Sequence, residues 1–206
     1  MMIRDWKTIM AMIAVPAAGL VFAESDDLDR VKKRMSEAGC CRFQFLAVVE
    51  SDVFDSVDST RGEAFIARDG RYSIALGADV YAFDGEYLFA YSQPNNQVTV
   101  EKVDPAVAPA EHISFITRLD QFYLGARLKE SSEYALKRID SAATGLPDSL
   151  TLKVQRNGEG IEWLEYFDIN SDRNRIVFER QDFLEGCPPE RFHPAFPDSV
   201  EYIKLY

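Results

Sequence analysis

The chain has 206 residues, of which 34 are acidic and 23 are Lys or Arg, giving a formal net charge of −11. A surface this acidic repels nucleic-acid phosphates and anionic lipid headgroups, so we expect no nucleic-acid partner and no polybasic attachment to membranes. The length suffices for one domain with a sizeable core.

The first 23 residues predict a secretory signal peptide. Arg4 and Lys7 precede an apolar run from Ile9 to Phe22, and Ala23 supplies a small residue at the cleavage point. The run, about 14 residues long, is too short to span a bilayer comfortably, although a retained anchor is the alternative. No Cys lies directly after the predicted cleavage site, which argues against a lipoprotein signal peptide. We therefore expect a periplasmic protein, soluble after cleavage, with a single domain over residues 24–206.

Three cysteines fall in the exported part of the chain, Cys40, Cys41 and Cys187. An oxidising compartment permits a disulfide between Cys187 and either Cys40 or Cys41. The sequence does not choose between the two adjacent partners, and three free thiols are the alternative.

The elements begin with one amphipathic helix and continue mainly as strands. Apolar residues recur at helical spacing after a cap at Ser25 and Asp26, and Gly39 ends the helix. Alternating patterns and turn residues then predict strands at 42–51, 62–69, 71–77, 79–84, 86–92, 97–103, 133–140, 148–156, 161–169, 174–183 and an edge-like strand near 200–206. Between them, near-helical spacing predicts one or two short helices over about 110–125, and the acidic stretch 51–60 reads as a hairpin loop.

The predicted fold class is mainly β. About ten or eleven antiparallel strands in one sheet must curl, and only two helical segments exist to cover it. We therefore expect an incomplete antiparallel β-barrel with an α-helical lid.

Large aromatic residues share one face of several predicted strands, which suggests a deep apolar interior. A well-filled core is the alternative, and a slip of one register would exchange the two faces. The residues expected to line a lipid-binding cavity are Phe43, Phe45, Phe65, Tyr72, Ile74, Tyr81, Phe83, Phe89, Tyr91, Ile116 and Leu119.

The stretches "GEAFIARDGRYSI" (62–74) and "YAFDGEYLFAYSQPNNQVTV" (81–100) resemble the outer-membrane lipoprotein carrier family, the LolA-like proteins. The resemblance lies in a Gly-led strand ending in Arg68, an Asp-Gly turn and a Leu-aromatic-x-Tyr strand. The late strands of 149–179 and the proline-bearing segment "FHPAFPDSVEYI" (192–203) extend it over most of the chain.

That resemblance implies an open barrel with a helical lid that carries lipoprotein acyl chains across the periplasm. The partners implied are acylated lipoproteins, an inner-membrane transporter and an outer-membrane acceptor, with the carrier expected to be a monomer. In the family the Arg at the position of Arg68 holds the lid closed through backbone hydrogen bonds. Asp69 stands where the family has Pro, so Arg68 could instead pair with Asp69 or Asp84.

No residue pattern indicates catalysis, and we expect neither an enzyme nor a cofactor. The segment 168–179 matches an EF-hand at its acidic positions, but Arg173 replaces the required Gly and the flanks read as strands, so a hairpin turn is favoured and no metal is expected. His112 and His193 lie far apart in sequence, without a nucleophile motif. The alternatives to a carrier are a lipid- or glycolipid-binding or sensing relative and a β-rich structural or interaction module.

Overall fold

The structure, a computed structural model, describes residues 26–103, 113–128, 132–139 and 145–206. The predicted signal peptide and His112 lie outside the described residues. Among the described helices, none is long and apolar enough to cross a membrane.

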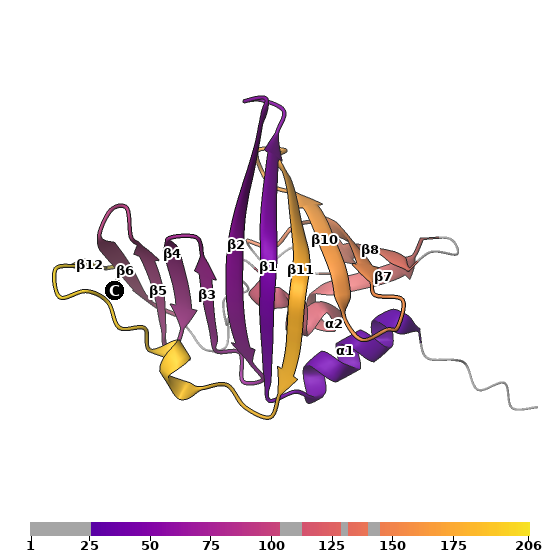
Figure 1. Cartoon of the computed structure of the whole chain (residues 1–206), viewed down its shortest axis with the longest axis horizontal. Helices are drawn as coiled ribbons and strands as arrows, with labels where there is room; N and C mark the ends of the chain where they lie inside the picture. The colour runs from indigo at the N-terminus through magenta and orange to yellow at the C-terminus, as the bar shows by residue number, and fades with distance from the viewer. Residues whose placement is uncertain (1–25, 104–112, 129–131, 140–144) are drawn as a thin grey trace, which may run out of the picture.

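One curled sheet of twelve strands forms the body of the protein, in the order β12-β6-β5-β4-β3-β2-β1-β11-β10-β9-β8-β7 (Figure 1). The first half is a meander of β1 (Cys40–Ser51), β2 (Ser56–Ala67), β3 (Tyr72–Leu76), β4 (Asp79–Phe83), β5 (Tyr87–Ser92) and β6 (Gln97–Lys102). The second half contains β7 (Tyr123–Arg127), β8 (Glu133–Arg138), β9 (Ser149–Val154), β10 (Ile161–Phe167) and β11 (Arg173–Leu184), and β12 (Glu201–Lys204) ends the chain. Since the edge strands β12 and β7 do not meet, the barrel is incomplete, as predicted.

The helices α1 (Asp27–Glu37) and α2 (Leu119–Phe122) and the 3-10 helix η2 (Ser114–Arg118) cover one face of this sheet, here called the inner face (Figure 1). A second 3-10 helix, η3 (Pro189–Phe192), lies on the path from β11 to β12. The mainly β fold with a helical lid is thereby confirmed.

Four details differ from the sequence prediction. The sheet has twelve strands rather than ten or eleven, because Tyr123–Arg127 forms β7, where a helix to about residue 125 was expected. The sheet is not wholly antiparallel, since β12 pairs in parallel with β6. The acidic segment 51–60 is mostly strand, because the β1–β2 turn is confined to residues 52–55. The first helix ends at Glu37, and Ala38 is already extended.

Candidate functional site

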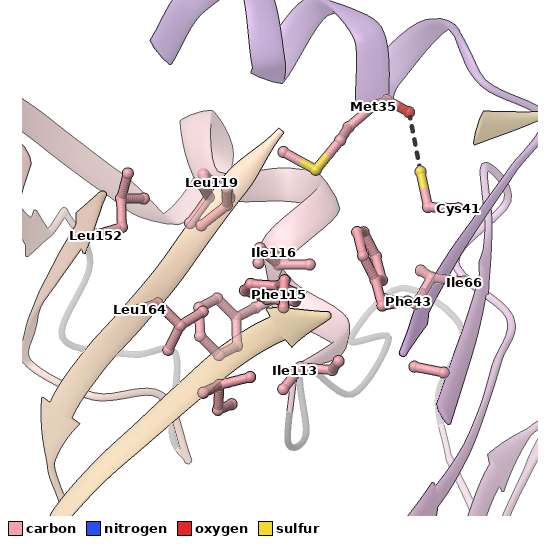
Figure 2. Packing of buried hydrophobic residues seen from close by; sticks show 14 of the residues in the cluster. Met35, Cys41, Phe43, Ile66, Ile113, Phe115, Ile116, Leu119, Leu152 and Leu164 are labelled. Carbon is pink, nitrogen blue, oxygen red and sulfur yellow. Dashed lines mark hydrogen bonds between the residues drawn. The ribbon is translucent and has the colours of Figure 1, made fainter. Parts of the chain in front are cut away.

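The lid packs its apolar side chains directly onto the inner face. Ile113, Phe115, Ile116 and Leu119 are all nearly inaccessible to solvent, and Figure 2 shows them between strands from both halves of the sheet. Alternation of these residues with Thr117, Arg118 and Asp120 gives the short segment one apolar side, which the curled sheet receives.

The helix α1 forms a second layer over this segment. It contacts η2 and β9, and it buries Leu28, Val31 and Met35, which recur at helical spacing. The lid therefore has two parts: an inner part formed by η2 and α2, and an outer part formed by α1.

The inner face itself is lined by aromatic and aliphatic side chains. Phe43 of β1 meets Phe178 of β11 edge-to-face with ring centroids 5.5 Å apart, and Tyr72 lies 6.0 Å from Phe83. Such aromatic pairs contribute about 1 kcal/mol beyond their area burial. Strands β8 to β11 contribute further aliphatic side chains to this face: Leu136, Leu150, Leu152, Val154, Ile161, Leu164 and Ile176.

Where the lid meets the inner face, the described side chains are closely packed. An apolar cavity of about 120 Å³ remains between Phe45, Ile74, Ile113, Tyr166 and Ile176. A cavity of roughly 150 Å³ accommodates a benzene molecule, so this space cannot hold the acyl chains of a lipoprotein. A second space of about 240 Å³ lies under the end of α1, lined in part by Met35, Cys41 and Arg68. The lid side chains occupy the place where a ligand was expected.

Eight of the eleven residues predicted to line the cavity lie on the inner face or in the lid. They are Phe43, Phe45, Tyr72, Ile74, Tyr81, Phe83, Ile116 and Leu119.

The other three, Phe65, Phe89 and Tyr91, lie on the opposite, outer face. Cross-strand pairing explains the difference, because Ile66 rather than Phe65 pairs with Tyr72, and Leu88 rather than Phe89 pairs with Phe83. Directly paired residues of antiparallel strands share a face.

The outer-face aromatics have their own partners. The guanidinium carbons of Arg42 and Arg191 lie 5.5 and 4.5 Å from the centre of the Phe65 ring. Phe89 and Tyr91 pack against Phe196, with ring centroids 6.3 and 5.2 Å away. The chain between β11 and β12 thus covers this patch, and these three side chains are unavailable to an inner-face ligand.

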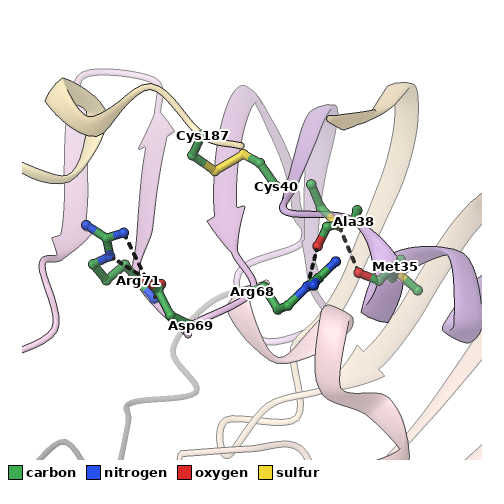
Figure 3. Close-up of a disulfide and its surroundings, with 8 residues drawn as sticks. Met35, Ala38, Cys40, Arg68, Asp69, Arg71 and Cys187 are labelled. Atoms are coloured by element: carbon green, nitrogen blue, oxygen red, sulfur yellow. Dashed lines mark hydrogen bonds and ion pairs between the residues drawn. A yellow bond between two sulfur atoms is a disulfide. The ribbon is translucent and has the colours of Figure 1, made fainter. Parts of the chain in front are cut away.

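Arg68 joins the sheet to the end of α1, as Figure 3 shows. Its Nε donates a hydrogen bond of 3.2 Å to the carbonyl oxygen of Ala38, and its guanidinium also donates to the carbonyl oxygen of Glu37. These carbonyls lie at the carboxyl end of the helix, where cationic donors are favoured. Hydrogen bonds of this kind are what the family resemblance implies for Arg68, and their role as a latch stays a prediction.

Neither carboxylate considered as a rival partner binds Arg68. Asp69 pairs with Arg71 at 2.8 Å, and although burial opposes it, the hydrogen bonds and charge of Arg71 hold the pKa of Asp69 below its usual value. Asp84 accepts hydrogen bonds from the backbone amides of Glu86 and Tyr87. Both carboxylates are thus engaged in their own turns.

The disulfide joins Cys187 to Cys40, which decides between the two predicted pairings. It ties the segment after β11 to the start of β1, three residues beyond Glu37 (Figure 3). Cys41 points to the inner face, as adjacent strand residues must alternate, and its thiol donates to the Met35 carbonyl oxygen at 3.6 Å. Burial raises the pKa of the Cys41 thiol to about 12, so it is held as a neutral thiol.

The acidic segment 168–179 forms a hairpin turn, as favoured from sequence. The Asp168 carboxylate accepts hydrogen bonds from the amides of Asn170 and Asp172 and from the side chain of Asn174. Within the described ranges, no cluster of His, Cys, Asp and Glu has an arrangement suited to a metal ion.

The chain is similar in sequence to one curated protein. No family model matches the chain. It is 22% identical over 158 residues to an outer-membrane lipoprotein carrier protein of Haemophilus ducreyi, covering 75% of each chain. This similarity confirms the resemblance to the LolA-like family.

Two solved structures are similar to this chain. An uncharacterised conserved protein from Thermus thermophilus matches 86% of this chain and 96% of its own at a TM-score of 0.51 and 8% identity. A LolA superfamily protein from Nitrosomonas europaea covers 81% and 95% of the two chains at a TM-score of 0.47 and 8% identity. The Thermus match supports the architecture alone.

Proposed function

We propose that this LolA-like protein is a periplasmic carrier that binds the acyl chains of lipoproteins and moves them from the inner to the outer membrane. The single observation that carries the proposal is an apolar lid seated on an apolar sheet face and fastened at one end by Arg68. In such a carrier, the arrangement described here would be the closed position of the lid.

The lid side chains are the natural counterpart of the acyl chains. An acyl chain left in water costs about 0.8 kcal/mol for each exposed methylene, so a carrier must offer an extensive apolar surface. Ile113, Phe115, Ile116 and Leu119 cover such a surface in the closed form. Cargo that displaces them exchanges one set of apolar contacts for another, which keeps the net free energy of loading small enough for release.

Arg68 sets the cost of opening in this scheme. Its donors hold the carboxyl end of α1 against β2, while the amino end has a separate tie through the Tyr134 hydroxyl, which donates to the carboxylate of Asp26. Loss of the Arg68 bonds would free the end of α1 that lies beside the 240 Å³ space. We infer that acyl chains enter there.

Titration with a fluorescent triacylated lipopeptide tests binding. The protein should bind it saturably, with unlabelled lipopeptide competing and the deacylated peptide failing to compete. A Leu119→Asp variant places a carboxylate in the lid interior and so reports on lid closure. The rate of amide hydrogen exchange in the lid should change in this variant. No saturable binding by the folded wild-type protein would contradict a carrier of acyl chains.

A packed β module and a lipid sensor are the competing functions, and the small interior cavities favour the former. Native mass spectrometry of protein extracted gently from its own cells distinguishes binding from packing, since a carrier or sensor should retain acylated species. Depletion of the protein then distinguishes carrier from sensor, because only loss of a carrier should leave outer-membrane lipoproteins in the inner membrane.

A further inference from the structure

The β1–β2 hairpin extends well beyond the strand that flanks it. Pairing of β2 with β3 covers Gly62 to Ile66, and the amide of Gly77 adds a 3.1 Å hydrogen bond to the Arg61 carbonyl oxygen. From Ser56 to Thr60, in the part of the chain that the structure describes, β2 pairs with β1 alone. Figure 1 shows this hairpin rising past β3 and β4, with one side of β2 uncovered.

The backbone groups at this free edge can be assigned from the ladder. The amide of Ala67 donates to Arg71 and the carbonyl of Arg61 accepts from Gly77, so odd-numbered residues of β2 direct their backbone groups towards the β3 side. The β1–β2 register runs without a bulge to Ser56. The N–H and C=O groups of Val57 and Ser59 therefore face outwards, where an additional strand could bind them.

Apolar side chains at the same place are unusually exposed. Val53 and Phe54 in the turn are 76% and 78% exposed, and Val57 on the edge is 66% exposed. None of the three belongs to the apolar core between lid and inner face or to the outer-face patch around Phe89, Tyr91 and Phe196. Exposed apolar groups beside unpaired strand edges are features of surfaces that receive extended peptides.

The charges around this edge indicate which kind of partner could bind there. Asp52, Asp55 and Asp58 are exposed around the apolar residues, whereas the cations nearby are already paired, Arg61 with Glu179 at 3.4 Å and Arg173 with Glu50. A second copy of the chain would bring like charges to the same edge, and anionic lipid would be repelled as well. An extended segment carrying Lys or Arg is the complementary occupant.

We propose that the β2 edge from Ser56 to Thr60, with Val53 and Phe54 beside it, is a docking site for an extended basic segment of a partner protein, which adds to the sheet as a thirteenth strand. Backbone hydrogen bonds of Val57 and Ser59 would supply affinity, Val57 and Phe54 apolar contacts, and the aspartates the preference for basic sequence. This site is on the hairpin rather than under the lid, and binding to it requires no acyl cargo.

The test uses the full mature chain and a capped eight-residue peptide alternating Lys with Val, and the control peptide has Glu in place of Lys. The Lys peptide should bind saturably below about 1 mM. Binding should protect the amides of Val57 and Ser59 from solvent exchange in NMR spectra, while the Glu peptide leaves them unchanged. Binding should also weaken as salt is raised.

Two matched variants isolate the backbone contribution. Val57→Pro removes an outward N–H at an edge position that tolerates proline, and it should weaken the peptide at least about tenfold while the circular dichroism spectrum is retained. Val57→Thr keeps the N–H and should bind within about threefold of wild type. If the proline variant fails to fold, the Asp55→Asn, Asp58→Asn double variant tests the contribution of the aspartate charges instead. It should also weaken binding of the Lys peptide.

Three results would overturn the proposal. The first is absence of Lys-peptide binding, or binding without protection at Val57 and Ser59. The second is a concentration-dependent dimer that loses its affinity in Val57→Pro, which would assign the edge to a second copy. The third is binding of the hairpin to neutral phosphatidylcholine vesicles, abolished by Phe54→Ser, in place of peptide binding.

Discussion

Replacement of Arg68 by Ala should loosen the end of α1 without unfolding the sheet. The substitution removes two hydrogen bonds to the carbonyls of Glu37 and Ala38. Because the Arg68 side chain is exposed, each bond should contribute about 1 kcal/mol, near the middle of the usual net range. The sum, about 2 kcal/mol, corresponds to an increase of roughly 30-fold in the opening constant of the lid.

Native-state hydrogen exchange measures this constant directly. Amides in α1, including those of Val31 and Met35, should exchange roughly 30-fold faster in Arg68→Ala, while those of β1 and β11 keep their wild-type rates. Arg61→Ala is the matched control, since Arg61 lies on β2, just ahead of Arg68 in the chain, and its exposed ion pair with Glu179 should contribute at most about 1 kcal/mol. It should leave α1 unchanged.

Two outcomes would refute this reasoning. Unchanged exchange in α1 would mean that the apolar contacts of Leu28, Val31 and Met35 hold the helix without Arg68. Equal acceleration throughout the sheet would mean that Arg68 contributes only to global stability. In either case Arg68 would not be a latch.

Three further results are expected. Cys41 should resist a thiol reagent at pH 8 in the native protein and react on unfolding, since burial raises its pKa to about 12; rapid native labelling would contradict the buried position. Reduction of the Cys40–Cys187 disulfide, whose partners are 147 residues apart, should lower the free energy of unfolding by about 2–5 kcal/mol in denaturant titrations, and an unchanged midpoint would count against it. Burial opposes ionisation of Glu63, but hydrogen bonds from Arg42 and Gln44 outweigh burial and lower the pKa of Glu63 below 4.5. The stability that ionised Glu63 contributes should therefore be present above pH 4.5 and disappear as the pH falls through the folded-state pKa. Arg42→Gln should reduce this pH dependence of stability, and a pH profile identical to that of the wild type would refute the pairing.

The alternation of residues along the sequence predicted the strands of the sheet, but not which face of each strand lies towards the lid. Alternation showed that Tyr81 and Phe83 lie on the same face of their strand, and that Phe89 and Tyr91 lie on the same face of theirs. It could not show whether these two pairs lie on the same face of the sheet. That relation depends on the β4–β5 turn, which pairs Phe83 with Leu88. A register derived from the Asp84-Gly85 turn would have assigned Leu88 to the inner face.

Other differences arise from tertiary contacts. Tyr123–Arg127 follows an apolar helical pattern in sequence, but pairing with β8 along the open edge makes it a strand. The choice of Cys40 over Cys41 follows from the opposite directions of neighbouring strand residues, which needed the position of the inner face. The sequence left both a deep apolar interior and a well-filled core open, because periodicity identifies apolar faces and not what covers them.

Where a bound acyl chain lies is the most direct test of the account. A lipopeptide with a paramagnetic label near the end of one acyl chain should broaden the methyl NMR signals of Ile74 and Leu164, which lie under the lid, and of Ile116 in the lid itself. The methyl signals of Val98 and Val200 on the outer face should stay sharp. Broadening confined to the outer-face valines, or no broadening at saturating lipopeptide, would contradict a cargo site beneath the lid.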